Sequence, residues 1–238
     1  MNILLLGYGK MGKTIEQIAL RKGHTISFIV DQNNYDDVKK VTPGSVDVAI
    51  EFTQPDSAFN NLAFCIDNNI PVVSGTTGWL ERRKELEEYC NKKGGAVFLS
   101  SNFSVGVNLF FHINQMVAKV MKDYPEYSIT MEEIHHTEKK DAPSGTAITL
   151  AERIMEEYPS KTSFVNEEAT QENELPIISK RIANVPGTHT VNYKSTIDSI
   201  ELTHTAFGRE GFASGAVVAA EWIVGKKGVF GMKDLLNF

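Results

Sequence analysis

Two adjacent histidines and a nearby lysine form the densest group of residue types that could do chemistry. His135 and His136 end a predicted strand, and Lys139 lies in the loop that follows. Histidine is the side chain most often used for proton transfer near neutral pH, and lysine supplies a compact positive charge for a carboxylate or phosphate. Together these side chains indicate a proton donor beside a site for an acidic substrate.

The helix predicted after this loop adds an anion-binding element. It opens with Ser144, Gly145 and Thr146, and backbone N–H groups at a helix start bind anions well. The alternative is an exposed charged loop in which Ser144 or Thr146 is an ordinary helix cap. The combination of histidines, lysine and helix start favours a substrate site. A metal site is disfavoured, because adjacent strand residues face opposite ways and no cysteine or third histidine lies nearby in the sequence.

A glycine-rich turn near the start of the chain has the pattern of a dinucleotide-binding loop. Gly7, Gly9 and Gly12 follow a predicted strand and open a predicted helix, which is the context that this pattern requires. Glycine allows the backbone to approach a pyrophosphate at the helix N-terminus. Asp31 ends the next predicted strand, where it could accept hydrogen bonds from ribose hydroxyls. The alternative is a plain tight turn and a strand-end aspartate, and the surrounding alternation of strands and helices favours the dinucleotide.

A second loop of small residues, Ser74 to Gly78, follows another predicted strand in the same half of the chain. Ligands of a doubly wound sheet lie beyond the carboxyl ends of the strands. Backbone and hydroxyl groups of Gly75, Thr76 and Thr77 could therefore contact the nicotinamide end of a cofactor. A loop that only caps the helix beginning near Trp79 explains the same residues equally well.

The elements that must position these residues change character along the chain. Up to about Asn102, short apolar runs that predict strands alternate with segments of helical spacing. Such alternation implies a parallel sheet with helices on both faces. The expected strands are 2–6, 25–30, 46–52, 71–74 and 96–99, and the expected helices are 10–22, 55–69 and 79–93.

The second half contains consecutive strands, which imply an antiparallel or mixed sheet. The expected strands are 127–134, 177–183, 188–196 and 199–207, and the expected helices are 105–122, 144–157 and 211–225. Residues 159–175 are polar and acidic without periodicity, so a surface loop is expected there. The predicted fold class is α/β, with an N-terminal Rossmann-type parallel sheet and a second, α+β domain containing a mixed sheet.

Composition excludes several classes of partner. The net charge is −6 and the isoelectric point is about 5.6, so no basic field is present to attract nucleic acid or anionic lipid. No apolar run approaches the roughly 18 residues of a membrane helix. Cys65 and Cys90 both fall in predicted helices and are expected to be reduced, structural thiols. These observations predict a soluble cytoplasmic protein with no membrane partner.

The run from Glu133 to Ala147 resembles the substrate-site signature of the dihydrodipicolinate reductases, which reads E-x-H-H-x-x-K-x-D-A-P-S-G-T-A. Other segments resemble the same family, namely Glu51–Thr53, Gly75–Gly78, Ser101–Asn108 and 212–216. The resemblance therefore extends over essentially the whole chain. It implies reduction of 4-hydroxy-tetrahydrodipicolinate, a dicarboxylate, to tetrahydrodipicolinate in lysine and diaminopimelate biosynthesis.

The resemblance also implies roles for individual residues. His135 is the implied acid that protonates C3 after hydride transfer to C4, and Lys139 is the implied catalytic lysine. The implied substrate-binding residues are His136, Ser144, Gly145 and Thr146. The implied contacts to NADH or NADPH are Gly7, Tyr8, Gly9, Lys10, Met11, Gly12, Asp31, Gly75, Thr76, Thr77, Ser100, Ser101, Asn102 and Phe103. Asp31 replaces the commoner glutamate, and Gln32 stands where arginine often does, so we expect NADH to serve at least as well as NADPH.

The family implies the same two-part organisation as the pattern of elements. Residues 1–103, rejoined by 209–238, are expected to bind the dinucleotide, and residues 104–208 are expected to bind the substrate and form a homotetramer. The two parts are expected to close about a hinge near Asn102. Another two-domain dehydrogenase, acting on aspartate or homoserine, would share the glycine turn but not the run from His135 to Thr146. A nucleotide-sensing protein without turnover would have no need of that run.

Overall fold

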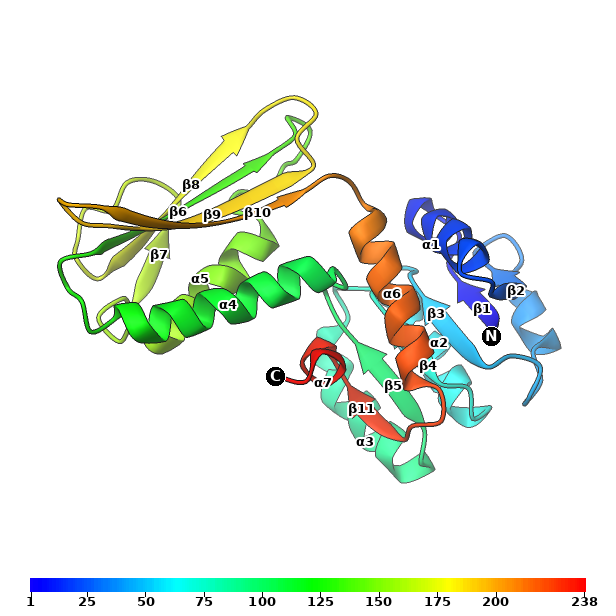
Figure 1. The fold of residues 1–238 in the computed structure, drawn as a ribbon. Helices are drawn as coiled ribbons and strands as arrows, with labels where there is room; N and C mark the ends of the chain where they lie inside the picture. Colours follow the sequence, from blue (N-terminus) through cyan, green and yellow to red (C-terminus); the bar gives the residue numbers. More distant parts are fainter. The chain divides into compact units, whose positions relative to one another are not determined.

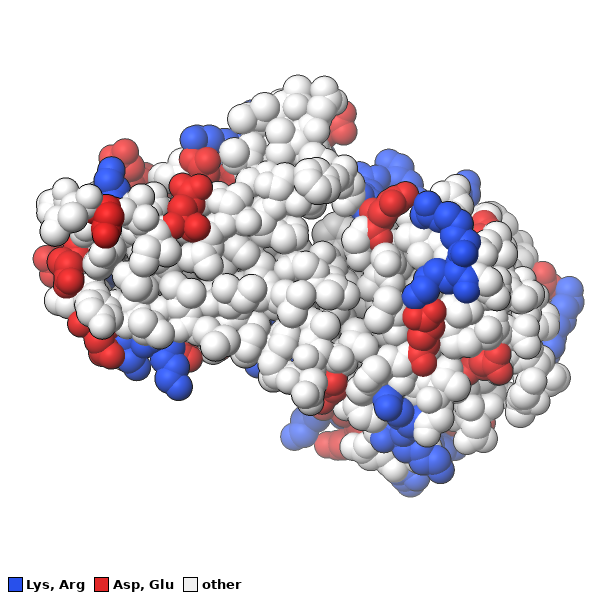
Figure 2. All heavy atoms as spheres, in the orientation of Figure 1, with Lys and Arg blue, Asp and Glu red and all other residues white.

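The computed structural model describes all 238 residues, which divide into two compact units. The first unit contains Met1–Val105 and Glu210–Phe238, and the second contains Gly106–Arg209 (Figure 1). No helix in either unit combines the length and the apolar character needed to cross a membrane. Acidic and basic side chains are intermixed on the face shown in Figure 2, so this face carries no extended field of one sign.

The first unit is built on a six-stranded parallel sheet with the order β11-β5-β4-β3-β1-β2. Its strands are β1 (Asn2–Leu6), β2 (Thr25–Val30), β3 (Val48–Glu51), β4 (Val72–Ser74), β5 (Ala96–Leu99) and β11 (Gly228–Phe230). Its helices are α1 (Lys10–Arg21), α2 (Pro55–Asp67), α3 (Arg83–Lys93), α6 (Glu210–Ile223) and α7 (Met232–Leu236), with 3₁₀ segments η1 (Tyr35–Lys40) and η2 (Leu80–Arg82).

The alternation of side chains along β1 explains why helices cover both faces of this sheet. Ile3 and Leu5 are buried in one core with residues of α1 and α6, whereas Leu4 and Leu6 are buried in a second core with residues of α2 and α3. Successive strand residues point to opposite faces, so an uninterrupted apolar run requires cover on both sides. The predicted Rossmann-type sheet with helices on both faces is confirmed.

The second unit has a five-stranded mixed sheet with the order β10-β9-β6-β8-β7. Its strands are β6 (Ser128–His135), β7 (Ser163–Val165), β8 (Glu174–Arg181), β9 (Gly187–Lys194) and β10 (Ser199–Ala206). Two helices, α4 (Val105–Met121) and α5 (Gly145–Glu157), share an apolar core with this sheet. Strand β6 runs parallel to β8 and antiparallel to β9, so the prediction of a mixed sheet is confirmed.

The structure corrects the sequence prediction at two short strands. Residues 159–175 were expected to form a surface loop, but they include β7 and the start of β8, and Phe164 pairs with Leu175 in parallel register. In the first unit, β11 was not predicted and pairs with β5. Each of these strands has three residues, which is too short for an alternating pattern to emerge. Pairing with a partner distant in sequence gives them their strand structure.

Candidate active site

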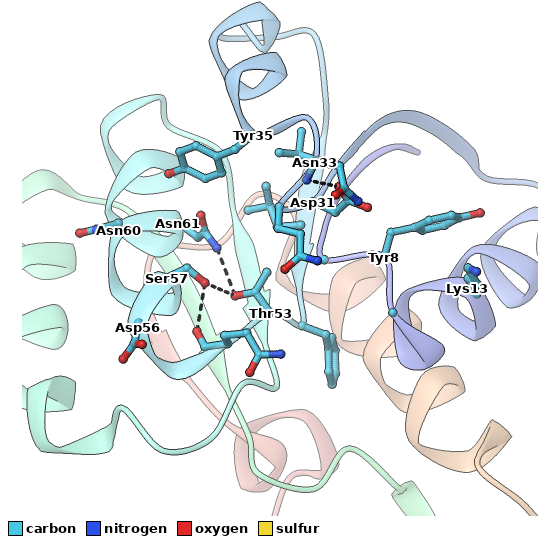
Figure 3. Close-up of a pocket in the computed structure, with 17 residues that line it drawn as sticks. Tyr8, Lys13, Asp31, Asn33, Tyr35, Thr53, Asp56, Ser57, Asn60 and Asn61 are labelled. Atoms are coloured by element: carbon cyan, nitrogen blue, oxygen red, sulfur yellow. Dashed lines mark hydrogen bonds between the residues drawn. The ribbon is translucent and has the colours of Figure 1, made fainter.

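A pocket of about 890 Å³ lies in the first unit, at the carboxyl ends of β1, β2 and β3 (Figure 3). Its lining includes Gly7, Tyr8 and Gly9 after β1, Asp31 after β2 and Thr53 after β3. This edge of a parallel sheet is where doubly wound folds bind nucleotides, and the volume falls within the range of small-molecule sites. The pocket is therefore a candidate dinucleotide site.

The glycine turn at this pocket is shaped by close backbone contacts. Gly7 has a φ of +94°, and a Cβ atom there would lie 2.0 Å from the carbonyl oxygen of Phe52. A Cβ atom at Gly12 would lie 2.3 Å from the carbonyl oxygen of Gly7, so both positions require glycine. At Gly9, in contrast, a Cβ atom would meet nothing within 4 Å. Gly9 is the N-cap residue of α1 and provides no side-chain cap, so the free N–H groups at the start of this helix are available to an anion.

The charges around Asp31 bear on recognition of the cofactor ribose. One oxygen of the Asp31 carboxylate accepts a hydrogen bond of 2.7 Å from the backbone N–H of Asn33. Lys39 and Lys40 form ion pairs of 2.6 Å with Asp36 and Asp37. These two lysines are therefore already paired with neighbouring carboxylates. The ribose side of the pocket has no arginine among its lining residues.

The loop after β4 is held by a buried carboxylate. Glu51 is fully buried and accepts hydrogen bonds from Ser74 Oγ at 2.5 Å and from Thr76 Oγ1 at 2.8 Å. Thr76 Oγ1 also accepts a hydrogen bond from the backbone N–H of Thr53. A Cβ atom at Gly75 would collide with the Phe52 ring. The Thr76 hydroxyl is thus used to fix the loop, and sequence analysis did not identify Glu51 as its partner.

The structure separates the predicted cofactor residues into groups. Gly7, Tyr8, Gly9 and Asp31 line the large pocket, while Thr76, Thr77, Ser100 and Ser101 line a small one of about 70 Å³. Lys10, Met11, Gly12, Gly75, Asn102 and Phe103 are not lining residues of either pocket. The Phe103 side chain is buried in the core, 5.7 Å from the Phe52 ring centroid. The large pocket is also lined by residues that no sequence pattern indicated, namely Lys13, Tyr35, Ser57 and Asn61.

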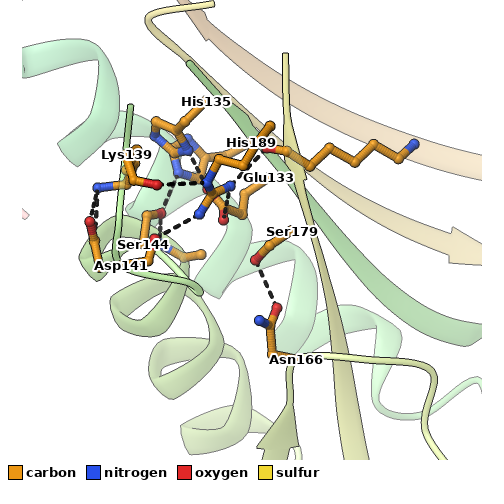
Figure 4. Close-up of polar contacts among 11 residues, drawn as sticks. Glu133, His135, Lys139, Asp141, Ser144, Asn166, Ser179 and His189 are labelled. Atoms are coloured by element: carbon orange, nitrogen blue, oxygen red, sulfur yellow. Dashed lines mark hydrogen bonds and ion pairs between the residues drawn. The ribbon is translucent and has the colours of Figure 1, made fainter. Parts of the chain in front are cut away.

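In the second unit, strand pairing gathers a cluster of charged side chains (Figure 4). Glu133 and His135 are two residues apart on β6 and therefore lie on the same face. The strand register places His189 of β9 opposite Glu133, and Arg181 of β8 opposite His135. Glu133, His135 and His189 are all buried. Three strands thus bring together residues that are far apart in the sequence.

The buried carboxylate of Glu133 links His135 and Arg181. Its Oε2 atom forms an ion pair with Nδ1 of His135, and its Oε1 atom accepts a hydrogen bond of 2.9 Å from Nη1 of Arg181. Burial alone would raise the pKa of Glu133, but the polar contacts with His135 and Arg181 lower it to about 2. Glu133 is therefore ionised at neutral pH.

His189 is a neutral member of the same cluster. Its ring centroid lies 5.1 Å from that of His135, and its Nε2 atom lies 3.1 Å from Oγ of Ser144. Burial, aided by the proximity of His135, lowers the pKa of His189 to about 4. No third histidine lies near His135 in the sequence, but β9 places His189 beside it in the folded chain. The expectation that only two histidines meet here was therefore wrong. Ligand atoms of Glu133, His135 and His189 lie within 4.8 Å of one another, but Arg181 already supplies positive charge there and disfavours a metal ion.

The loop that carries Lys139 is tied to the sheet by Arg181. Nη2 of Arg181 donates to the carbonyl oxygen of Asp141 at 2.7 Å, and Nε donates to that of Lys139 at 3.4 Å. Lys139 itself forms an ion pair of 2.7 Å with the Asp141 carboxylate and is partly exposed. Lys139 therefore presents a cation at the edge of the buried cluster, and sequence analysis did not identify Arg181.

The start of α5 lies next to the cluster and contacts it through Ser144. Ser144 is buried, caps the helix by accepting a hydrogen bond from the backbone N–H of Ala147, and contacts His189. Gly145 is exposed and Thr146 half-buried, and no acidic residue lies in the first turn. The Nδ1 atom of His136 is buried without a hydrogen-bond partner. The helix start can therefore receive an anion, whereas the Ser144 hydroxyl already has partners within the protein.

Comparison with protein families gives two matches in sequence order. Residues 1–103 match the model of the dihydrodipicolinate reductase N-terminus, and residues 106–236 match that of the dihydrodipicolinate reductase C-terminus. The two matched regions together span almost the whole chain.

Individual relatives agree with these matches. A 4-hydroxy-tetrahydrodipicolinate reductase from Christiangramia forsetii is 51% identical over 239 aligned positions, which cover 100% of this chain and 98% of that protein. The enzyme of the same name from Methanoregula boonei is 38% identical, over 80% of this chain and 75% of its own. A solved structure of a dipicolinate-bound dihydrodipicolinate reductase from Paenisporosarcina sp. TG-14 has the same fold, with a TM-score of 0.79, 21% identity and 97% coverage of both chains.

Proposed function

The chain belongs to the dihydrodipicolinate reductase family, and we propose on this premise that it reduces 4-hydroxy-tetrahydrodipicolinate to tetrahydrodipicolinate with a nicotinamide cofactor. This is a reductive step of lysine and diaminopimelate biosynthesis. The observation that carries the proposal is the buried Glu133–His135 pair, which lies in one cluster with Lys139 and the start of α5. A proton donor beside an anion site is what reduction of this dicarboxylate requires.

The reaction consumes one hydride and one proton and releases water. Loss of the 4-hydroxyl group gives a conjugated ring, hydride from the dihydronicotinamide adds to C4, and a proton adds to C3. Hydride addition places negative charge on the conjugated system, so an acid near C3 lowers the barrier. We assign this acid to His135 and assign stabilisation of the developing charge to Lys139, which carries a positive charge near the same cluster.

The two carboxylates of the substrate need two anion-binding groups. One is the start of α5, where the backbone N–H groups of Gly145 and Thr146 are not masked by an acidic side chain. We assign the other to His136 and Lys139, the positions that match the substrate-site signature of the family. The Paenisporosarcina relative holds dipicolinate, an aromatic dicarboxylate, which agrees with a substrate of this class. Ser144 then acts through the shape of the helix start, because its hydroxyl is occupied by Ala147 and His189.

The cofactor occupies the pocket of the first unit in this proposal. The uncapped start of α1 beside Gly9 receives the pyrophosphate, and Asp31 accepts from the ribose hydroxyls. A carboxylate repels a 2′-phosphate, Gln32 is uncharged, and Lys39 and Lys40 are already paired. We therefore assign NADH as a cofactor used at least as well as NADPH.

The second unit offers a surface for assembly into a homotetramer. One face of its sheet is covered by α4 and α5. Side chains such as Thr130, Thr190 and Asn192 line a shallow depression of about 620 Å³ elsewhere on this sheet. Light scattering at micromolar protein concentration tests the assembly, and the mass of a monomer would refute it.

A coupled assay tests the proposed reaction. Purified dihydrodipicolinate synthase supplies the unstable substrate, and loss of dihydronicotinamide absorbance reports reduction. We expect absorbance to fall only when synthase, its substrates and this protein are all present. A nucleotide-sensing protein would bind the dinucleotide without oxidising it, so binding of NADH without turnover of either cofactor would overturn the proposal.

A further inference from the structure

The His135 ring is flanked by the buried carboxylate of Glu133, which is neither the proposed acid nor a proposed substrate ligand. Glu133 has no solvent exposure, and its two carboxylate oxygens have different partners. Oε2 is paired with Nδ1 of His135, and Oε1 accepts from Arg181. Burying a carboxylate costs free energy unless the group is paired and hydrogen-bonded. The contacts with His135 and Arg181 therefore offset the desolvation of Glu133.

A glycine lies beside the opposite edge of the His135 ring. A Cβ atom at Gly187 would lie 3.0 Å from Nε2 of His135, so the missing side chain leaves space beside that nitrogen. His135 is 8% exposed. The ring therefore has one nitrogen fixed by Glu133 and the other facing a space that no side chain of Gly187 fills.

We propose that Glu133 is a positioning residue for the reduction: its carboxylate accepts the Nδ1–H of His135, so that the proton delivered to substrate is the one on Nε2. Because the carboxylate is anionic, it also stabilises the protonated ring before transfer and holds the ring in one orientation afterwards. The inference rests on the proposed role of His135 as the acid. It adds a residue that acts through His135 and does not touch the substrate.

Arg181 extends this arrangement to the lysine. The same guanidinium that donates to Glu133 also donates to the carbonyl oxygens of Lys139 and Asp141. Arginine presents its donors in a rigid planar fork, so the position of the carboxylate and the path of the loop are fixed together. Glu133 and Arg181 thereby fix the position of His135 relative to the backbone of Lys139.

Glu133→Gln distinguishes a positioning role from a merely structural one. Arginine can only donate hydrogen bonds, so the amide oxygen of the glutamine turns toward Arg181 and its NH₂ group turns toward Nδ1 of His135. The ring must then accept at Nδ1, and the protonated ring would meet a second donor. An equivalent exchange of carboxylate for amide beside a catalytic histidine lowers kcat by about 10⁴-fold in serine proteases. We expect a fall in kcat of about 10²- to 10⁴-fold, with KM and cofactor Kd changed far less.

The pH profile gives a second readout of the same variant. The charged or titratable groups around the His135 ring are Glu133 on its own strand, Arg181 on β8, His189 on β9, and Lys139 and Asp141 in the loop. Glu133→Gln removes only the negative charge nearest the ring. In the wild type, kcat/KM should fall as the pH rises and the His135 ring loses its proton. We expect this fall to begin at a lower pH in Glu133→Gln, because the protonated ring has lost its anionic partner.

A double-mutant cycle separates this inference from the proposed function. If Glu133 acts through His135, Glu133→Gln lowers kcat in the wild type but adds little in the His135→Gln background. Equal losses in both backgrounds, or wild-type kcat for Glu133→Gln alone, would overturn the inference while leaving the role of His135 intact. Wild-type turnover of His135→Gln would instead refute the assignment of the acid.

Two further measurements guard against a folding artefact. Glu221→Gln is a matched control, because Glu221 also pairs with a histidine, His24 at 2.7 Å, in the first unit; we expect wild-type kcat. In the wild-type protein, ¹⁵N NMR of labelled histidines, assigned with His135→Gln, reads the tautomer directly. The inference requires the neutral His135 ring to carry its proton on Nδ1, and a proton on Nε2 in the resting neutral ring would overturn it without any variant at Glu133.

Discussion

Nε2 of His135 lies 3.0 Å from the position that a Cβ atom would occupy at Gly187. Gly187 is the first residue of β9, and its φ is not in the left-handed region. Its backbone conformation is therefore open to any residue, and the requirement for glycine is one of space beside the ring. The start of β9 therefore lies against the Nε2 edge of His135, the proposed proton donor on the neighbouring strand β6.

Gly187→Ala should therefore impair turnover more than folding. The added methyl group pushes the His135 ring by a few tenths of an ångström, and misplacement of a catalytic group by about 1 Å can cost about 10²-fold in rate. We expect kcat to fall about tenfold or more, with little change in KM, as measured by steady-state kinetics. Gly208→Ala is the control, because a Cβ atom there meets nothing within 4 Å. Unchanged kcat in Gly187→Ala would show that the ring tolerates the contact.

Lys139→Met tests the assignment of the catalytic lysine. It keeps the length of the side chain but removes the charge that is proposed to stabilise the transition state, so kcat should fall with kcat/KM. Lys140→Met is a closely matched control, since Lys140 is the adjacent lysine and is exposed. Steady-state kinetics should show a large loss for the first variant and a small one for the second. The reverse order would move the catalytic role to Lys140.

Thr146→Val tests the proposed carboxylate site at the start of α5. The substitution is nearly isosteric and removes one hydroxyl group from a half-buried position. If this hydroxyl binds a substrate carboxylate equally in the ground and transition states, KM rises while kcat changes little. The affinity for NADH should be unchanged, because the proposed cofactor pocket lies in the first unit. A loss of kcat at unchanged KM would show that Thr146 acts in the chemical step.

Much of the fold could be predicted because its signals are local. The apolar runs of β1 and β2 and the helical spacing of α1 each lie within a few consecutive residues, and they specify a parallel sheet between helices. The edge strands β7 and β11 could not be predicted in the same way. Each has three residues, and each is a strand only because β8 or β5 provides hydrogen bonds.

The residues of the candidate site also differ in whether a local pattern could reveal them. His135, Lys139 and the start of α5 are close in sequence, so their residue types alone indicated a site. Arg181 and His189 come to the cluster through the register of β8 and β9 against β6. No local pattern encodes that register before the sheet is known. Gly187, His189, Val191 and Tyr193 alternate with polar residues along β9 and are buried, and this alternation is a signal that could have placed His189 on the core face.

Cofactor preference is predicted to depend on the charge at Asp31. The wild-type enzyme should have a kcat/KM for NADH at least equal to that for NADPH, because the carboxylate repels a 2′-phosphate. Asp31→Ser removes the repulsion, and Gln32→Arg supplies a bidentate partner for the phosphate. The double variant should shift the ratio of the two kcat/KM values toward NADPH by tenfold or more. A tenfold shift corresponds to about 1.4 kcal/mol, which is the size of one close charge interaction. A wild-type enzyme with a large preference for NADPH would contradict this reading of the pocket.

His189 should make the stability of the protein depend on pH between about 4 and 6.5. Burial, together with the nearby His135, lowers the pKa of His189 from 6.5 to about 4. A depressed pKa means that the unfolded chain binds a proton in this range and the folded chain does not. The contribution of His189 to stability is therefore fully present above pH 6.5 and is lost as the pH falls toward 4. A shift of this size corresponds to roughly 3 kcal/mol.

The effect can be isolated with His189→Gln, which has no titrating group and can still hydrogen-bond to Ser144. Urea unfolding at a series of pH values gives the free energy of unfolding for both proteins. The wild type should lose stability more steeply than the variant between pH 6.5 and 4. Below pH 4 the two curves should fall in parallel, because Glu133, whose pKa is lowered to about 2, loses its contribution in both as the unfolded carboxyl becomes protonated. Parallel curves between pH 6.5 and 4 would mean that His189 titrates in the folded protein as it does in the unfolded chain, and that the burial of its ring does not oppose protonation.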